Sequence, residues 1–280
     1  MSAVRGQGQG PSTRQKAEAF LAIFRRQLAV ASLSAFRSDY LHVDLHAGCG
    51  WNEAAGCDGS PVLFLRAAES WEPRDRRVCA YFMEHNPEAA AALRGRLAGL
   101  RPSGAGGVFW QVVEGDNGAG LRAVAGGHPP DVVGTLLCDP NGIKSVPLAD
   151  LGPFFGRFRR VDAVWQANLS LFRKLRGCKE HGMSGFERYP DVAGVVAEMR
   201  KANWWVRNPS RVAGEMLTTL YGTNAPPSLS LSLSRRLEFY PVQGEGHDAD
   251  TGREILARLN RCEPAREDVF PEFRDPRYWR

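Results

Sequence analysis

Residues 135–142 read Thr-Leu-Leu-Cys-Asp-Pro-Asn-Gly, an apolar run that ends in an acid, a rigid proline and a polar amide. In open parallel sheets, ligands bind beyond the carboxyl ends of the strands. Asp139, Pro140 and Asn141 are therefore the candidate catalytic residues. An ordinary turn uses the same residue types, and for this segment taken alone the turn is the better interpretation. The functional interpretation depends on how the other strands end.

Short apolar segments that read as strands recur along the chain, at residues 40–45, 78–83, 108–113, 132–138 and 161–167, with helical segments between them. This alternation predicts an α/β fold with a mostly parallel twisted sheet and helices on both faces. Four of the strands end in or near an acid: Asp44, Glu84, Asp116 and Asp139. If these four strands are neighbours, the acids form a row about 14 Å long, which suits an elongated ligand.

The residue types in the row narrow the choice of ligand. A metal ion needs carboxylates that converge on one point, which a row does not provide, so no metal is expected. A dinucleotide site favours Gly-x-Gly-x-x-Gly, but Gly48-Cys49-Gly50 lacks the third glycine, and Glu53 would place an anion near a pyrophosphate. S-adenosylmethionine has no phosphate and carries a cationic sulfonium, for which nearby acids are favourable. The acids therefore favour this cofactor.

In their order and setting, the segments 44–50 and 139–142 together with Glu84 and Asp116 resemble the class I S-adenosylmethionine-dependent methyltransferases, a Rossmann-like fold. More narrowly, Gly59-Ser60-Pro61, the segment 144–147 and the segment 220–224 resemble the three-Cys-motif partner proteins of bacteria and phages. The resemblance covers about residues 38–260.

The resemblance assigns a role to each matching residue. It implies that Asp44, Ala47, Gly48 and Gly50 hold the methionine end of the cofactor. Glu84 would bind the ribose hydroxyls, Asp116 the adenine amino group, and Asp139 and Asn141 would lie nearest the methyl group. For Asp44 and Asp116 the alternative is a helix cap, and for Glu84 a surface acid at a turn.

The 139–142 motif resembles the Asp-Pro-Pro-aromatic signature of methyltransferases that act on amino groups of bases. Here Asn141 replaces the second proline and Gly142 the aromatic residue. Base stacking would need Phe154, Phe155 or Trp165, whose types favour the core instead. Methylation of a cytosine carbon needs a thiolate, usually after proline, and the chain has no Pro-Cys pair. Cys138 reads as a buried small hydrophobic residue.

A basic stretch indicates a possible nucleic-acid partner. Between residues 157 and 179 the chain has one acid and seven basic residues, although its whole net charge is only +5. We expect this surface to contact nucleic acid, because such clusters attract phosphates. Its basic residues are Arg157, Arg159, Arg160, Arg173, Lys174, Arg176 and Lys179.

The remaining composition predicts a cytoplasmic protein of 280 residues with free thiols, because no apolar stretch spans a bilayer and the six cysteines form no Cys-x-x-Cys pair. The expected organisation is a disordered segment (1–12), a helical segment (13–37, with the helix itself at 16–36), the methyltransferase-like domain (38–262) and a tail (263–280). Within the domain we expect helices at 87–97, 192–201 and 251–262, strands at 204–206, 216–221 and 237–240, and either a strand or a loop at 228–234.

Two functions follow as hypotheses. The first is methyl transfer from S-adenosylmethionine to an amino group of a nucleic-acid base. The second is a non-catalytic accessory protein that binds the same cofactor and acts with a partner protein. A metal-dependent nuclease is a third and weaker alternative.

Overall fold

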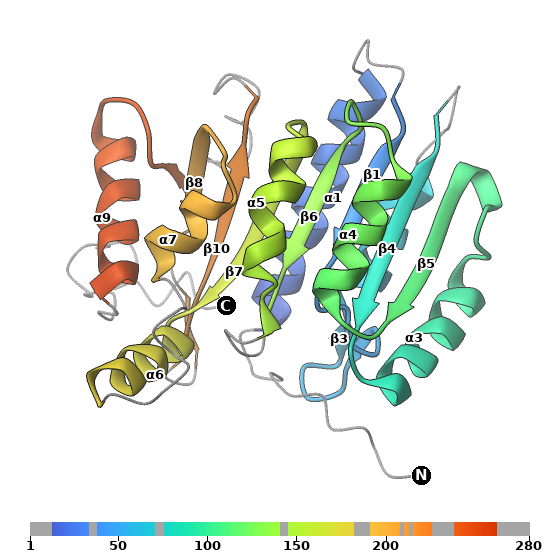
Figure 1. Ribbon diagram of the computed structural model, residues 1–280, viewed down its shortest axis with the longest axis horizontal. Coiled ribbons are helices and arrows are strands. Elements are labelled where there is room, and N and C mark those ends of the chain that lie inside the picture. Colours follow the sequence, from blue (N-terminus) through green and yellow to red (C-terminus); the bar gives the residue numbers. More distant parts are fainter. Residues whose placement is uncertain are drawn as a thin grey trace, which may run out of the picture.

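The structure is a computed structural model that describes residues 13–33, 38–70, 76–140, 145–181, 191–207, 210–212, 215–225 and 238–261. Its centre is a mixed sheet (Figure 1). All five strands expected at its core are present, each within one residue of its expected ends. These are β1 (Tyr40–Asp44), β4 (Val78–Glu84), β5 (Val108–Glu114), β6 (Val133–Cys138) and β7 (Val161–Asn168).

The five strands run parallel in the order β5-β4-β1-β6-β7. In chain order this is 3-2-1-4-5, the order of a doubly wound Rossmann-like sheet. The strand order reverses between β1 and β6, where Asp44 lies level with Leu137. Ligands of such folds bind at this reversal, beyond the carboxyl ends of the strands. The predicted α/β class with a mostly parallel sheet is confirmed.

Beyond β7 the sheet continues with antiparallel pairs. β10 (Glu215–Thr223) lies between β7 and β8 (Asn203–Arg207) and runs antiparallel to both. β11 (Phe239–Pro241) pairs with β8, and β9 (Ser210–Val212) pairs with β10. The sequence predicted strands near β8, β10 and β11, but it indicated neither their direction nor β9. A separate hairpin of β2 (Trp51–Asn52) and β3 (Cys57–Asp58) follows β1.

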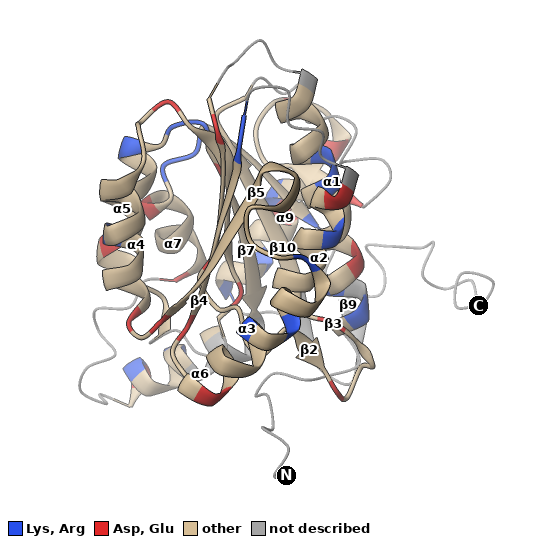
Figure 2. Ribbon diagram, turned by 90° about the vertical axis from the view of Figure 1, so that its right-hand side faces the viewer, with Lys and Arg blue, Asp and Glu red and all other residues tan. Residues whose placement is uncertain are grey.

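Helices cover both faces of the sheet (Figure 2). The helices on each face pack their apolar side chains against the strands. This gives two buried clusters, one on each side of the sheet. The first face carries α1 (Thr13–Leu33), α2 (Ser60–Ala67) and α3 (Pro87–Leu100), with the short η1 (Ala68–Ser70) after α2 and η2 (Ala105–Gly107) before β5. The second carries α4 (Asn117–Gly127), α5 (Leu148–Arg157), α7 (Val192–Glu198) and α9 (His247–Arg261). α6 (Leu169–Glu180) continues from the carboxyl end of β7.

α1 is held to the sheet by apolar packing and by one buried polar network. Phe20 and Phe24 are buried in the cluster of the first face. Nε2 of Gln27 donates to Oδ2 of Asp162 at 2.8 Å, and the Tyr221 hydroxyl donates to the same oxygen at 2.5 Å. Burial raises the pKa of Asp162, and its hydrogen bonds oppose that rise. The network therefore fixes α1 against β7 and β10.

Several element boundaries differ from the sequence expectation. The helix expected at 16–36 spans 13–33, and the one expected at 192–201 ends at residue 198, because Arg200 adopts a left-handed conformation (φ 49°). The last helix begins at His247 rather than at 251, with Asp248 and Asp250 in its favourable first turn. Residues 228–234 and Cys262 lie outside the described residues. In the described part of the chain, no helix is long and apolar enough to cross a membrane.

Candidate functional site

The four predicted acids lie at one edge of the sheet, which we call the carboxyl edge. Asp44 and Glu84 end β1 and β4, Asp139 directly follows β6, and Asp116 lies two residues beyond β5. Because β5, β4, β1 and β6 are consecutive neighbours, the acids follow in the order Asp116, Glu84, Asp44 and Asp139. The carboxyl edge faces downwards in Figure 1. The expected row of acids is therefore present in the structure.

Asp44 is the most buried acid of the row, with no exposed surface. The Ser60 hydroxyl donates to its Oδ2 at 2.6 Å, and the backbone N–H of His46 donates to its Oδ1 at 3.0 Å. Burial raises the pKa of Asp44 to about 7. The two hydrogen bonds lower this pKa, while the charges of Asp139 and Glu84 raise it further. Asp44 thus forms no cap of the following helix; it is a desolvated carboxyl group beside two other acids.

The glycine turn after β1 brings backbone close to the row. Gly48 (φ +63°) and Gly50 (φ +77°) both adopt the left-handed conformation that favours glycine. The N–H of Gly48 donates to Oε2 of Glu84 at 2.8 Å, and that of Ala47 donates to the carbonyl of Met83 at 2.9 Å. These bonds tie the turn to the end of β4.

The two glycines differ in their surroundings. A Cβ on Gly48 would meet no atom within 4 Å, so this position is open on the side of the missing side chain. A Cβ on Gly50 would lie 2.8 Å from Cδ1 of Leu93. Gly50 is therefore required for packing against α3, and only Gly48 leaves room for a ligand.

Asp116 and Glu84 also bond to backbone groups. Asp116 caps α4, since its Oδ1 accepts from the N–H of Ala119 at 2.7 Å. Glu84 Oε1 accepts from the N–H of Asn86 at 2.8 Å. Both carboxylates are fixed in place by these contacts. Capping by Asp116 is compatible with the adenine role that the resemblance implies, and that role stays a prediction.

Two buried acceptor atoms near the row have no hydrogen-bond partner in the described structure: Nδ1 of His46 and Oδ1 of Asn117. Nε2 of His46 lies 3.1 Å from the carbonyl oxygen of Ser145, which only accepts, so Nε2 carries the proton. Burial lowers the pKa of His46, so its ring is neutral and Nδ1 is an acceptor. Nδ2 of Asn117 donates to the carbonyl of Leu45 at 2.6 Å, which leaves Oδ1 as the unpaired acceptor. Both atoms could accept hydrogen bonds from a ligand rich in N–H groups or positive charge.

Asp139 lies at the end of β6 next to the reversal of strand order. Its Oδ2 forms an ion pair of 2.6 Å with Nζ of Lys16, from the first turn of α1. Pro140 is buried, and Asn141 lies outside the described residues.

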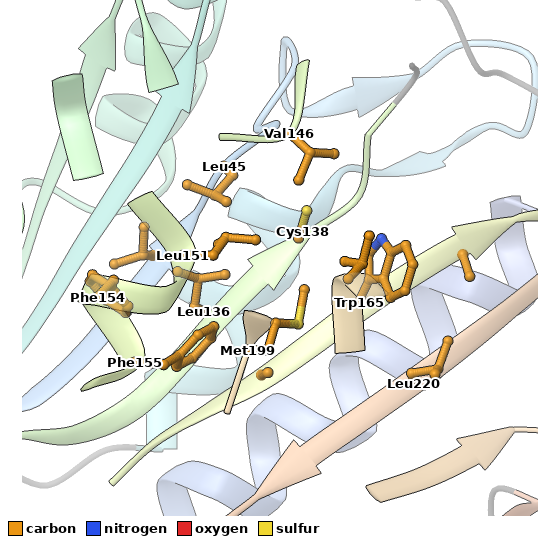
Figure 3. Packing of buried hydrophobic residues seen from close by; sticks show 14 of the residues in the cluster. Leu45, Leu136, Cys138, Val146, Leu151, Phe154, Phe155, Trp165, Met199 and Leu220 are labelled. Carbon is orange, nitrogen blue, oxygen red and sulfur yellow. The ribbon is translucent and has the colours of Figure 1, made fainter. Parts of the chain in front are cut away.

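The residues around Asp139 are core residues. Cys138 is fully buried, and burial raises the pKa of its thiol well above the usual value, which suits the predicted hydrophobic role and not a nucleophile. Figure 3 shows it beside Trp165, its neighbour on β7. Phe154, Phe155 and Trp165 are at most 2% exposed. None of the three aromatic residues is available to stack on a base.

Within the described ranges, no group of three His, Cys, Asp or Glu side chains could hold a metal ion. The five cysteines there are free thiols.

The basic stretch does not form one surface, contrary to the expectation from the sequence. Arg157, Arg159 and Arg160 precede β7, whereas α6 follows it with the remaining four basic residues. The eight residues of β7 separate the two groups by about 23 Å. Arg157 donates to the carbonyl of His128, away from the carboxyl edge. Only Arg173, Lys174, Arg176 and Lys179, on α6, follow the carboxyl end of a strand next to β6.

Comparison with known proteins gives structural matches only. No protein-family model and no curated protein matches the chain. The structure is similar to protein LPL1258 from Legionella pneumophila, with a TM-score of 0.50 and 14% identity over 82% of this chain and 97% of that one. This similarity shows the fold alone.

The matching structures include several methyltransferases. One, from Geobacter sulfurreducens, has a TM-score of 0.35 and 16% identity, over 75% of this chain and 80% of that one. Another is the DszA carbon methyltransferase, with a TM-score of 0.42 and 13% identity, over 75% of this chain and 55% of that one. These scores carry no argument about chemistry, which rests on the site.

The structure adds four residues that the sequence did not single out as site residues: Lys16, His46, Ser60 and Asn117. His46 and Ser60 belong to motifs that carried the resemblance, and Asn117 follows Asp116. These three were therefore within reach of sequence reasoning. Lys16 had no such signal, because it is one of many charged residues on an amphipathic helix.

Proposed function

We propose that this protein is an S-adenosylmethionine-dependent methyltransferase that acts on an amino group, with a nucleic-acid base as the acceptor. The observation that carries the proposal is the row of acids along four neighbouring strand ends, joined by two unpaired buried acceptors. The methionine ammonium, the sulfonium and the adenine amine are the positive or N–H groups that such a row favours. A phosphate-bearing dinucleotide would instead be repelled.

The residues present fit this cofactor. Asp44, Gly48 and Glu84 would hold its methionine and ribose parts, and Asp116 its adenine, with His46 and Asn117 as further acceptors. When bound, the cofactor supplies an electrophilic methyl group: the acceptor nitrogen bonds to the methyl carbon, the carbon–sulfur bond breaks with its electron pair left on sulfur, and the amine proton leaves to water. Asp139 would accept a hydrogen bond from the acceptor amine and so raise the electron density on its nitrogen.

The position of α6 supports the proposed acceptor. This helix continues from β7 beside β6, so its four basic residues start at the same edge as Asp139. A phosphate backbone along α6 would bring a base towards that edge.

A second candidate is the accessory protein suggested by the resemblance to three-Cys-motif partner proteins. Two observations favour it. The sequence of residues 139–142 lacks the aromatic residue of the base-methyltransferase signature, and Phe154, Phe155 and Trp165 are buried. With none of these three rings available to stack on a base, the site would serve only to bind the cofactor while a partner protein performs the reaction.

Titration calorimetry with S-adenosylmethionine and with its demethylated product tests the cofactor. We expect both to bind, and Glu84→Ala to weaken binding by about 10-fold to 100-fold, the effect of losing one charged hydrogen-bond acceptor. Asp131→Ala is the matched control, because this acid precedes β6 at the opposite edge and bonds only to Ser38 among the described residues. Absence of binding by the wild type, or equal effects of the two variants, would overturn the proposal.

Transfer of labelled methyl to DNA, RNA or protein in a lysate separates the two candidates. Label in nucleic acid supports the methyltransferase, and binding without transfer supports the accessory protein.

The acceptor surface is tested by two variants, Lys179→Ala and Arg159→Ala. Each removes one charge, the first from the helix that follows β7 and the second from the segment that precedes it. We expect only Lys179→Ala to weaken nucleic-acid binding. The salt dependence of the binding constant of this variant should correspond to about one fewer released counterion.

A further inference from the structure

The ion pair between Lys16 and Asp139 joins α1 to the acceptor side of the candidate site. Nζ of Lys16 lies 2.6 Å from Oδ2 of Asp139, and the two side chains are only 17% and 21% exposed. The two residues are 123 positions apart in the chain. Lys16 comes from the helix that precedes the first strand, so α1 brings this cation to the site from outside the four strands that carry the row of acids.

The position of Lys16 is set by the packing of the helix behind it. Phe20, Ile23 and Phe24 are buried against the sheet, and Gln27 is anchored to Asp162. Lys16 lies in the first turn of α1, where the helix dipole favours acids and disfavours a cation. The local preference of the helix therefore does not explain a lysine at this position, whereas the carboxylate of Asp139 does.

Asp139 needs such a cation because it lies among other acids. Its charge and that of Glu84 both act on the buried Asp44. Lys16 is paired with the carboxylate of Asp139 and contacts its Oδ2 alone. Among the described residues, none donates a hydrogen bond to the other oxygen, Oδ1. Within the described part of the chain, one carboxylate oxygen is thus fixed and the second has no donor.

We propose that Lys16 is a positioning residue: it fixes the orientation of the ionised Asp139 through Oδ2, so that Oδ1 accepts the N–H of the acceptor amine. This inference rests on the proposed methyltransferase function and deepens it. α1 is then part of the reaction centre as well as part of the fold. The acceptor is selected as a neutral amine, since the charge of Asp139 is already balanced by Lys16.

The test compares Lys16→Met, which keeps the length and loses the charge, with Lys16→Arg, which keeps the charge. We expect Lys16→Met to lower kcat about 10-fold to 100-fold, with the dissociation constant of the cofactor changed less than about twofold. Lys16→Arg should recover most of the activity.

Arg66→Met is the control, because it breaks a similar ion pair of 2.9 Å between α2 and Asp58 in the adjacent hairpin. It should leave kcat unchanged. A purely structural role of Lys16 would lower kcat and cofactor affinity together, whereas a positioning role lowers kcat alone and is restored by Lys16→Arg. If Lys16→Met transfers methyl groups like the wild type, the inference is wrong while the proposed function stands.

A measurement that does not need activity completes the test. In a double-mutant cycle of Lys16→Met and Asp139→Asn, the unfolding equilibrium constant should show a coupling of about fivefold, as expected for a partly buried ion pair. Additive effects would overturn the inference even if the wild type transferred no methyl group. Mass spectrometry after incubation with S-adenosylmethionine should find Lys16 unmodified, since methylation of Lys16 would make it the acceptor instead.

Discussion

Replacing Asp44 by asparagine should stabilise the protein at alkaline pH while it removes a group proposed to bind the cofactor. Asp44 is fully buried, and its pKa is raised from the ordinary 3.8 to about 7. A carboxyl group whose pKa is raised by folding stabilises the folded state below its unfolded pKa, and this contribution is lost as the pH rises to the folded value. For Asp44 the loss occurs between 3.8 and about 7. Asparagine does not ionise, so the variant does not lose stability over this pH range.

The size of the effect follows from the shift. A rise of about 3 pH units corresponds to about 4 kcal/mol, all of it unfavourable to the folded wild type above about pH 7. Asparagine has one acceptor oxygen, so it keeps only one of the hydrogen bonds from Ser60 and His46, at a cost of about 1–2 kcal/mol that does not depend on pH. The variant should therefore be about 2–3 kcal/mol more stable than the wild type at about pH 8, and nearly equal to it at about pH 5.

Urea unfolding of both proteins at the two pH values measures this difference. The wild-type and variant chains share every other titrating group, so the change of their difference with pH isolates Asp44. Ser60→Ala serves as a control in the opposite direction, because its hydroxyl lowers the pKa of Asp44 and its loss should enlarge the pH dependence. An unchanged difference between wild type and Asp44→Asn across this range would refute the reasoning that Asp44 is a desolvated, poorly ionised acid.

Two further predictions concern ligand binding and the glycine turn. Binding of the cationic cofactor should release a proton from Asp44 to the buffer. The binding enthalpies measured near pH 6 in phosphate and in imidazole should therefore differ by up to the difference between the ionisation enthalpies of the two buffers, for about one proton. Equal enthalpies in both buffers would contradict this. Gly48→Ala should cost about 1–2 kcal/mol of unfolding free energy from backbone strain and weaken cofactor binding. Gly50→Ala should cost about 2–4 kcal/mol, because its methyl group also meets Leu93. Urea unfolding and calorimetry of both variants would check this order, and a more stable Gly50→Ala would contradict it.

The parallel core could be predicted from the sequence because each strand is a short apolar run bounded by turn residues. The row of acids followed from it, since the carboxyl ends of neighbouring parallel strands meet at one edge. The ends of β1, β4, β5, β6 and β7 were right to within one residue. What the sequence did not contain was the direction of β10, because alternation of side chains is the same in parallel and antiparallel strands.

The basic stretch shows a second limit of sequence reasoning. Arg159 and Lys179 are 20 positions apart, and composition alone groups them. β7 carries the chain from one edge of the sheet to the other, so the two residues lie at opposite ends of the strand. A count of charges in a window cannot detect such a reversal, whereas the predicted strand at 161–167 already implied it.

Lys16 shows the third limit. The pattern of α1 predicted a helix packed on the domain, and the buried Phe20 and Phe24 agree with that. Which of its charged residues reaches the site depends on the register of the helix on β6, and one sequence holds no record of that register. Contacts between residues 123 positions apart have no local signature.

The anchoring of α1 also sets an order of events during synthesis. Gln27 is bonded to Tyr221, which follows it by 194 residues. At a translation rate of about 5–20 residues per second, the helix waits about 10–40 s before that partner has been made. During this interval its apolar face has no completed sheet to cover. A chain halted before β10 would therefore possess the glycine turn, all four acids and the bond from Gln27 to Asp162, but α1 would lack the second anchor that Tyr221 provides.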